Sequence, residues 1–245
     1  MRHENKANFF IHTFLFVISC SQAGCSQRIN RAKIPSQALL ISDIAAYNNT
    51  VKHNPEKRLV LLNSYVYNLF TDFKYATYQN FTHRILYTDP HAYVRLPVAI
   101  ALEKIQEELS VKGLGLKVFD AYRPYSVTKE MWKVVPDERY AANPAKGSGH
   151  NRGAAVDVTL VNISSLKELE MPTAFDDFSE KAHHTYMKLP KNILQNRALL
   201  KTIMEKYGFI ALSTEWWHYS FLDATTKFEL LDLSFDQLKK LEKNQ

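Results

Sequence analysis

The sequence predicts an α+β fold, with a small and mainly antiparallel β-sheet flanked by helices. Segments with helical spacing and segments with strand composition are mixed along the chain, without the regular strand–helix alternation of a parallel sheet. The chain has 245 residues, of which 46% are hydrophobic, and this is enough for one large core. We therefore expect a single domain over residues 57–245.

Two segments are expected before this domain. Residues 1–25 have the pattern of an export signal, because Arg2 and Lys6 precede an apolar run from Phe9 to Cys20 that is too short to span a membrane. The run ends either in VISC, typical of a lipoprotein signal with a lipidated Cys20, or in the cleavage pattern SQA (21–23). Both endings predict an exported, periplasmic protein, and the first also predicts membrane attachment. Residues 26–56 are polar and predict a tether followed by an arm lying on the domain.

Charge and cysteine usage exclude several classes of protein. The 31 basic and 25 acidic residues are scattered, so no basic patch for nucleic acid is expected. The only cysteines, Cys20 and Cys25, lie before the domain. The domain therefore has neither a cysteine-based zinc site nor a disulfide framework.

The first half of the domain predicts two strands and two helices. The apolar run Leu59 to Leu62 has strand composition. Apolar residues from Leu96 to Leu109 recur at helical spacing, and Pro97 suits a first helical turn. A strand is expected at Leu116 to Ala121, and Ser126 is a candidate cap for a helix through Val134.

The second half begins with a loop over 136–148 and then predicts three strands and two helices. Val156, Val158 and Leu160 alternate with polar or smaller residues, as in a strand. Residues 164–190 are expected to be irregular, with room for one helix inside. The remaining expected elements are strands at 154–161, 209–212 and 216–221, an amphipathic helix at 192–207 and a helical tail at 228–241.

The stretch SGHNRGAAVD (148–157) carries the first candidate site residues. His150 lies in a glycine-rich turn, and Asp157 lies in the strand that follows. A glycine turn allows residues seven positions apart to converge on one ion. An aspartate in an apolar strand is costly when buried without a partner, so Asp157 must be paired, coordinated or exposed.

A second stretch, EWWH (215–218), supplies Glu215 and His218. Together with His150 and Asp157 these residues are the set that a zinc hydrolase needs, namely three ligands and a carboxylate that moves protons. Residues three apart on a regular strand face opposite ways, so a bend near Trp216 or Trp217 is required.

Each of these residues also has an ordinary structural explanation. His150 could lie on the surface, His218 could be a hydrogen-bonded core histidine, and Asp157 could form a turn or a salt bridge. Arg123 could form a surface salt bridge, and Tyr75 and Asp176 have no signal of their own. Spacing alone therefore leaves the metal site open.

Five blocks, in this order, resemble the zinc-dependent D-alanyl-D-alanine dipeptidases of the vancomycin-resistance type, in the peptidase M15 group of zinc D,D-peptidases. The blocks are KYATYQNF (74–81), DAYRP (120–124), SGHNRGAAVDVTLV (148–161), PTAFDDFSEKAHH (172–184) and TEWWHY (214–219). The resemblance spans about residues 70 to 222. Its most specific part is the ordered pair SxHxxGxAxD and EWWH.

The resemblance implies a role for each matching residue and one Zn²⁺ in a central cleft. His150, Asp157 and His218 are expected to bind the zinc. Glu215 is expected to act as the catalytic base and Arg123 to stabilise the oxyanion. Ser148 is expected to contact the substrate carboxylate, and Asp176 and Tyr75 to lie near the substrate ammonium.

The implied reaction is hydrolysis of the dipeptide D-Ala-D-Ala during cell-wall peptide turnover. An alternative is a D,D-carboxypeptidase acting on peptidoglycan stem peptides, and a further one is a lipoprotein that binds cell-wall peptide without turnover. The motif usually reads SSHSRGSAID in these dipeptidases, so Gly149, Asn151 and Ala154 are departures that leave the expected ligands in place. An export signal is also not general in the family.

Overall fold

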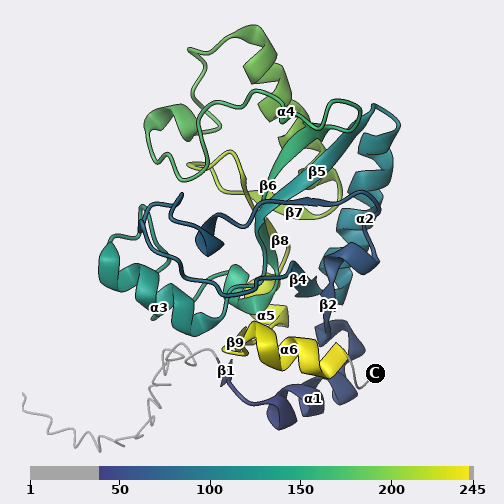
Figure 1. Cartoon of the computed structure of the whole chain (residues 1–245), viewed down its shortest axis with the longest axis vertical. Coiled ribbons are helices and arrows are strands. Elements are labelled where there is room, and N and C mark those ends of the chain that lie inside the picture. The colour runs from purple at the N-terminus through teal and green to yellow at the C-terminus, as the bar shows by residue number, and fades with distance from the viewer. Residues whose placement is uncertain (1–38, 243–245) are drawn as a thin grey trace, which may run out of the picture. The chain divides into compact units, whose positions relative to one another are not determined.

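A five-stranded β-sheet forms the centre of the computed structural model, which describes residues 39–242 (Figure 1). The strand order is β3-β5-β6-β8-β7. The strands are β3 (Phe70–Thr71), β5 (Leu114–Asp120), β6 (Ala155–Asn162), β8 (His218–Phe221) and β7 (Phe209–Ala211).

The predicted mixture of helices and strands is confirmed, but the expectation of a mainly antiparallel sheet was wrong, because this sheet is mixed. β5, β6, β8 and β7 pair antiparallel, whereas β3 pairs parallel with β5. The two-residue strand β3 belongs to an aromatic-rich segment that runs along the edge of β5. It runs in the same direction as β5. Side-chain pattern reports which residues are buried, but it does not report the direction of a neighbouring strand.

Two long helices cover one face of the sheet. α2 (Leu96–Ser110) contacts β5, and α4 (Lys191–Lys206) contacts β6 and β7. Leu102 and Ile105 of α2 and Leu200 of α4 have no exposed surface and share a core with Val158 and Leu160 of β6. Burial of each such side chain contributes about 1.5–3 kcal/mol. Both helices agree with their predicted positions, and Gly208, with φ of +88°, follows the end of α4.

A second apolar cluster joins the two ends of the described chain. β1 (Leu40–Ile41) pairs in parallel with β9 (Leu230–Leu231), and α6 (Phe235–Glu242) lies beside α1 (Ile44–His53) in Figure 1. The expected tail helix is thus divided into a short strand and a shorter helix. The remaining elements are β2 (Leu59–Leu61), β4 (Tyr93–Arg95), α3 (Tyr125–Val134) and α5 (Ala224–Lys227).

Residue Ser126 does not cap α3, as the sequence suggested. It lies inside the helix, and its backbone N–H donates to the carboxylate of Asp232 at 2.8 Å. The cap therefore comes from a residue 106 positions away, which local sequence does not reveal.

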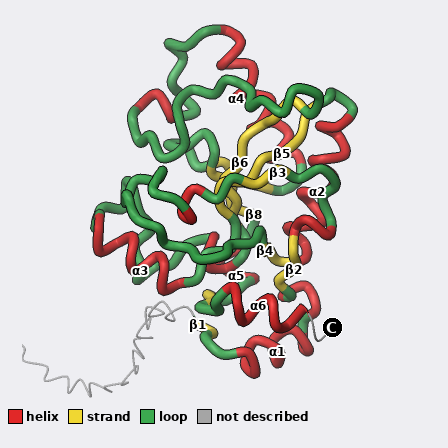
Figure 2. The backbone as a smooth tube through the Cα atoms, viewed as in Figure 1, coloured by secondary structure: helices red, strands yellow, loops and turns green. Residues whose placement is uncertain are grey.

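Long loops connect the sheet to the helices (Figure 2). Between β6 and α4, residues 163–190 contain a 3₁₀ turn, Glu180–Ala182, and an isolated β-bridge from Glu168 to Val161. This agrees with the expected irregular segment, and no α-helix forms in it. Within residues 39–242, no helix is both long and apolar enough to cross a membrane. The expected signal over residues 1–25 and most of the tether lie outside the described residues, so the division of the chain into three segments stays a prediction.

Candidate metal centre and catalytic site

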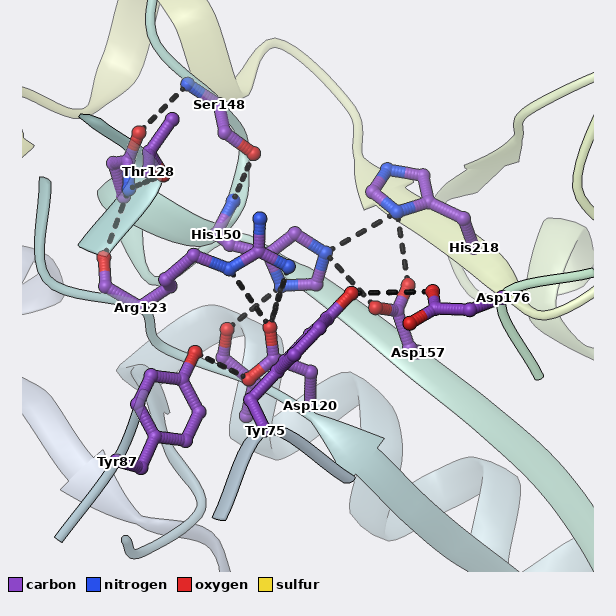
Figure 3. A network of polar contacts seen from close by, with 12 residues as sticks. Tyr75, Tyr87, Asp120, Arg123, Thr128, Ser148, His150, Asp157, Asp176 and His218 are labelled. Carbon is purple, nitrogen blue, oxygen red and sulfur yellow. Dashed lines mark hydrogen bonds and ion pairs between the residues drawn. The ribbon is translucent and has the colours of Figure 1, made fainter. Parts of the chain in front are cut away.

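Three side chains from separate segments converge at one point of the sheet (Figure 3). Potential ligand atoms of His150, Asp157 and His218 all lie within 4.8 Å of one another. His150 Nε2 is 3.2 Å from His218 Nδ1 and 3.4 Å from Asp157 Oδ2. His218 Nδ1 is 2.9 Å from Asp157 Oδ1.

Strand register explains how two of these residues meet. Asp157 in β6 and His218 at the start of β8 are directly paired, and side chains of directly paired residues project from the same face of a sheet. Asp157 is also paired with Asp120 of β5 on its other side, after a register shift that follows Val118. The third side chain, His150, comes from the 3₁₀ turn His150–Arg152, which ends at Gly153 with φ of +65°.

A bound cation would balance the donors and acceptors at this point. The carbonyl oxygen of Ala121 lies 2.7 Å from His150 Nδ1, so this nitrogen donates, and Nε2 of the neutral imidazole is then an acceptor. That acceptor faces a second acceptor, Asp157 Oδ2. Burial opposes ionisation of Asp157, but His150 and His218 hold the pKa of its carboxyl well below the ordinary value. Two imidazoles and a carboxylate are a donor set that suits Zn²⁺.

The structure shows what holds the second ring nitrogen of each histidine, the one that faces away from the proposed metal position. The sequence alone did not identify these partners. Ala121 O holds His150, and Ser220 Oγ lies 3.2 Å from His218 Nε2. Such contacts fix the ring orientation of a metal-binding histidine and select which nitrogen faces the metal.

Glu215 lies in a turn before β8 and not in a strand. The backbone N–H of Glu215 donates to Leu212 O at 3.1 Å, and the N–H of His218 donates to Glu215 O at 3.4 Å. This turn is the bend that the sequence required, and it lets both Glu215 and His218 face one cavity. Burial raises the pKa of Glu215 to about 7, so its carboxyl can exchange protons near neutral pH.

Arg123 is buried and held by a carboxylate that the sequence analysis did not select. Its Nε and Nη2 donate to Asp120 Oδ2 at 3.0 and 2.7 Å, and Tyr87 donates to Asp120 Oδ1 at 2.9 Å. The guanidinium carbon lies 5.0 Å from the centre of the Tyr75 ring. A signal for Asp120 existed, because it is an acid at the end of an apolar strand, just as Asp157 is an acid within one. Tyr87 had no such signal.

The remaining predicted residues line the same cavity. Tyr75 donates its hydroxyl to Asp176 Oδ1 at 3.2 Å, and the N–H of Phe81 donates to Asp176 Oδ2 at 3.3 Å. Burial raises the pKa of Asp176 to about 7. Ser148 Oγ accepts the backbone N–H of His150 at 3.2 Å.

All eight predicted site residues contact one cavity of about 210 Å³. This is smaller than the 300–1,000 Å³ typical of drug-sized pockets, so the cavity fits a small ligand. Its remaining lining is largely aromatic and aliphatic. These lining residues are Phe81, Met131, Glu138, Tyr140, Ala141, Ala142, Phe178, Leu212 and Trp217.

Comparison with known proteins agrees with this geometry. The peptidase M15 family, described as D-Ala-D-Ala dipeptidase, matches residues 55–237. The chain belongs to the peptidase M15 family. The D-alanyl-D-alanine dipeptidase of Escherichia coli K12 is 33% identical over 155 residues, covering 63% of this chain and 80% of that protein. The D-alanyl-D-alanine dipeptidase of Enterococcus faecalis V583 is 32% identical over 190 residues, covering 69% and 93%.

Solved structures similar to this M15 chain are more distant. The LD-carboxypeptidase LdcB has 21% identity and a TM-score of 0.36, covering 54% of this chain and 62% of its own. A variant of the vancomycin resistance D,D-pentapeptidase VanY, in complex with Zn(II), has 16% identity and a TM-score of 0.35, covering 57% and 80%. These scores are too low to add to the family assignment, which rests on sequence.

Proposed function

We propose that the chain is a zinc-dependent dipeptidase that hydrolyses D-Ala-D-Ala to D-alanine, with one zinc ion per chain. The observation that carries the proposal is the convergence of His150, Asp157 and His218 in a cavity of about 210 Å³ that the carboxylate of Glu215 also lines. The names of the M15 relatives from two bacteria support the substrate.

Residues His150, Asp157 and His218 would hold the zinc ion. When bound, zinc supplies a Lewis acid and lowers the pKa of a coordinated water. Ala121 O and Ser220 Oγ orient the two imidazoles toward the proposed metal position. This preorganisation reduces the cost of ordering the site on metal binding.

Glu215 is the proposed proton carrier. It takes a proton from the attacking water and later gives it to the leaving amine. A base works best when its pKa is near the operating pH, and burial has moved the pKa of Glu215 to about 7. Its position in the turn, three residues before His218, keeps it next to the metal ligands without making it one.

Arg123 is proposed to stabilise the negative charge that develops on the scissile carbonyl oxygen. Asp120 binds two of its nitrogens and fixes the plane of the guanidinium. A charge-stabilising donor that is already oriented needs no rearrangement when the reaction occurs. The Tyr75 ring packs against the guanidinium and limits its movement further.

A dipeptide is a zwitterion, and the cavity has groups of both kinds. The carboxylate of Asp176 is proposed to receive the substrate ammonium, which would favour its ionised form despite burial. The Ser148 hydroxyl is proposed to contact the substrate carboxylate. Tyr75 holds Asp176 through its hydroxyl.

One observation favours the alternative, a D,D-carboxypeptidase for longer stem peptides. A second hollow of about 490 Å³ adjoins the cavity, and Glu138, Tyr140, Phe178, Leu212 and Glu215 line both. A longer peptide could extend into this hollow. Purified protein with zinc should be incubated with D-Ala-D-Ala and, separately, with a stem pentapeptide ending in D-Ala-D-Ala. Release of D-alanine from the dipeptide alone supports the dipeptidase, release from the pentapeptide alone supports the alternative, and release from neither rejects both.

The site of action is proposed to be outside the cytoplasmic membrane, in the periplasm. The protein would be anchored there if Cys20 is lipidated, and unanchored if the signal is cleaved at SQA (21–23). The sequence of residues 1–25 supports this proposal. Cell fractionation tests it, because recovery of the protein wholly in the cytoplasm would reject export.

A further inference from the structure

One buried amide connects the separate parts of the proposed site. Asn151 follows the proposed ligand His150 in the 3₁₀ turn, has no exposed surface and does not line the cavity. It therefore contacts neither the metal position nor the space for substrate. Two of its three hydrogen-bond partners, Arg123 and Ser148, nevertheless line the cavity.

The Asn151 amide makes three hydrogen bonds to three segments. Its Oδ1 accepts the backbone N–H of Ser148 at 3.0 Å. Its Nδ2 donates to the backbone carbonyl of Arg123 at 2.9 Å and to Thr128 Oγ1 in α3 at 2.8 Å. In Figure 3 the connected residues Arg123, Thr128 and Ser148 lie on the side of His150 away from His218 and Asp157.

The backbone partners fix the orientation of this amide. A Ser148 N–H needs an acceptor and an Arg123 carbonyl needs a donor, so the oxygen and nitrogen of Asn151 are not interchangeable. Arg123 also donates its own N–H to His150 O at 3.1 Å. Both backbone polar groups of Arg123 are thus tied to the turn that carries His150.

We infer that Asn151 is a positioning residue, which holds Arg123 and Ser148 in register with His150. This inference rests on the proposed function, because it assigns Arg123 to the oxyanion. The amide acts through Arg123 and does not touch the reacting atoms. Loss of its donor would leave a buried carbonyl unpaired and release the backbone from which the guanidinium extends.

The substitution Asn151→Asp tests this inference with little change of shape. An aspartate still accepts from Ser148 but presents a carboxylate oxygen to the Arg123 carbonyl. Because the proposed contact of Arg123 forms in the transition state, we expect kcat for D-Ala-D-Ala to fall about tenfold to a hundredfold with KM almost unchanged. The zinc content should stay that of the wild type, because Asn151 binds no metal.

Residues Thr128 and Gln106 provide the second variant and the control. Thr128→Val removes the Oγ1 acceptor and should lower kcat by a smaller factor, whereas Thr128→Ser retains a hydroxyl and should restore it. Gln106→Glu makes the same amide-to-acid change at a buried amide that joins α2 to β5, through a hydrogen bond from Leu116 N at 2.9 Å. It should lower thermal stability and leave kcat and KM unchanged.

The outcomes separate this inference from the proposed function. A wild-type protein that does not hydrolyse D-Ala-D-Ala overturns both. An active wild type with normal kcat in folded, zinc-loaded Asn151→Asp overturns the positioning role alone. If Asn151→Asp does not fold, wild-type kcat in Thr128→Val overturns it. A variant that loses zinc in proportion to its activity also overturns it.

Discussion

The role proposed for Arg123 requires its guanidinium to bind Asp120 and the developing oxyanion at the same time, and Arg123→Lys should separate these two contacts. Nε and Nη2 bind Asp120 Oδ2 at 3.0 and 2.7 Å, while Nη1 has no hydrogen-bond partner among residues 39–242. A lysine has one compact ammonium at the end of a flexible stem. It can pair with Asp120 or reach the scissile carbonyl oxygen, but it cannot hold both positions.

The expected loss is that of one preorganised oxyanion donor. This lowers kcat by about 10²–10³, which corresponds to about 2.7–4 kcal/mol of transition-state stabilisation. KM should change little, because the charge on the oxygen develops only in the transition state. Steady-state release of D-alanine from D-Ala-D-Ala measures both constants, and metal analysis confirms that zinc is retained. Arg84→Lys is the matched control, since Arg84 is exposed and outside the cavity lining. If Arg123→Lys keeps kcat within about twofold of the wild type, the oxyanion role is wrong.

Three further substitutions probe separate features of the site. Glu215→Gln should abolish turnover while zinc stays bound, and turnover near the wild-type level would contradict this. In the wild type, kcat/KM should fall as the pH drops below about 7, because the protonated carboxyl of Glu215 cannot accept a proton. Asp176→Asn should raise KM, and it should raise Tm more at pH 8 than at pH 5. The reason is that burial raises the pKa of Asp176 to about 7, so stability is lost as the pH rises through that value; equal Tm shifts at both pH values would refute the argument. Gly149→Ala should destabilise the fold by about 1–3 kcal/mol, because the added Cβ would lie 2.8 Å from Ala155 Cβ and 3.1 Å from Ser220 Oγ. Chemical denaturation measures this loss, and unchanged stability would show that the strand can move aside.

Much of the local structure could be predicted from sequence. The helices α2 and α4 and the strands β5 and β6 follow from apolar spacing, since each buries one continuous face or run. The direction of β3 could not be predicted, because pairing across a sheet depends on where a distant segment returns. The cap of α3 by Asp232 could not be predicted for the same reason.

The site was predicted in part from chemistry and in part from resemblance. The out-of-place Asp157 in an apolar strand indicated a pairing or coordination role without any relative. The resemblance, now confirmed at the level of the family, selected four further residues, Arg123, Ser148, Asp176 and Tyr75. All four line one cavity in the structure. Their individual roles stay predictions.

The supporting contacts around the site were not predictable. The Ala121 carbonyl that orients His150 is a backbone group, and backbone groups carry no sequence signal. Asn151 differs from the usual family residue, and the sequence indicated only that this departure leaves the ligands intact. Its three hydrogen bonds require the tertiary fold, because their partners come from the loop before His150, the loop after β5 and helix α3.

The most direct test of the central claim is a zinc titration of the metal-free protein, followed by release of D-alanine from D-Ala-D-Ala. We predict no release without metal, and a rate that rises to a plateau at one zinc ion per chain. The same titration of Asp157→Ala should give no plateau, because one of the three proposed ligands is absent. Full D-alanine release from the metal-free protein, or none at any zinc concentration, would contradict the assignment of His150, Asp157 and His218 to a catalytic zinc site.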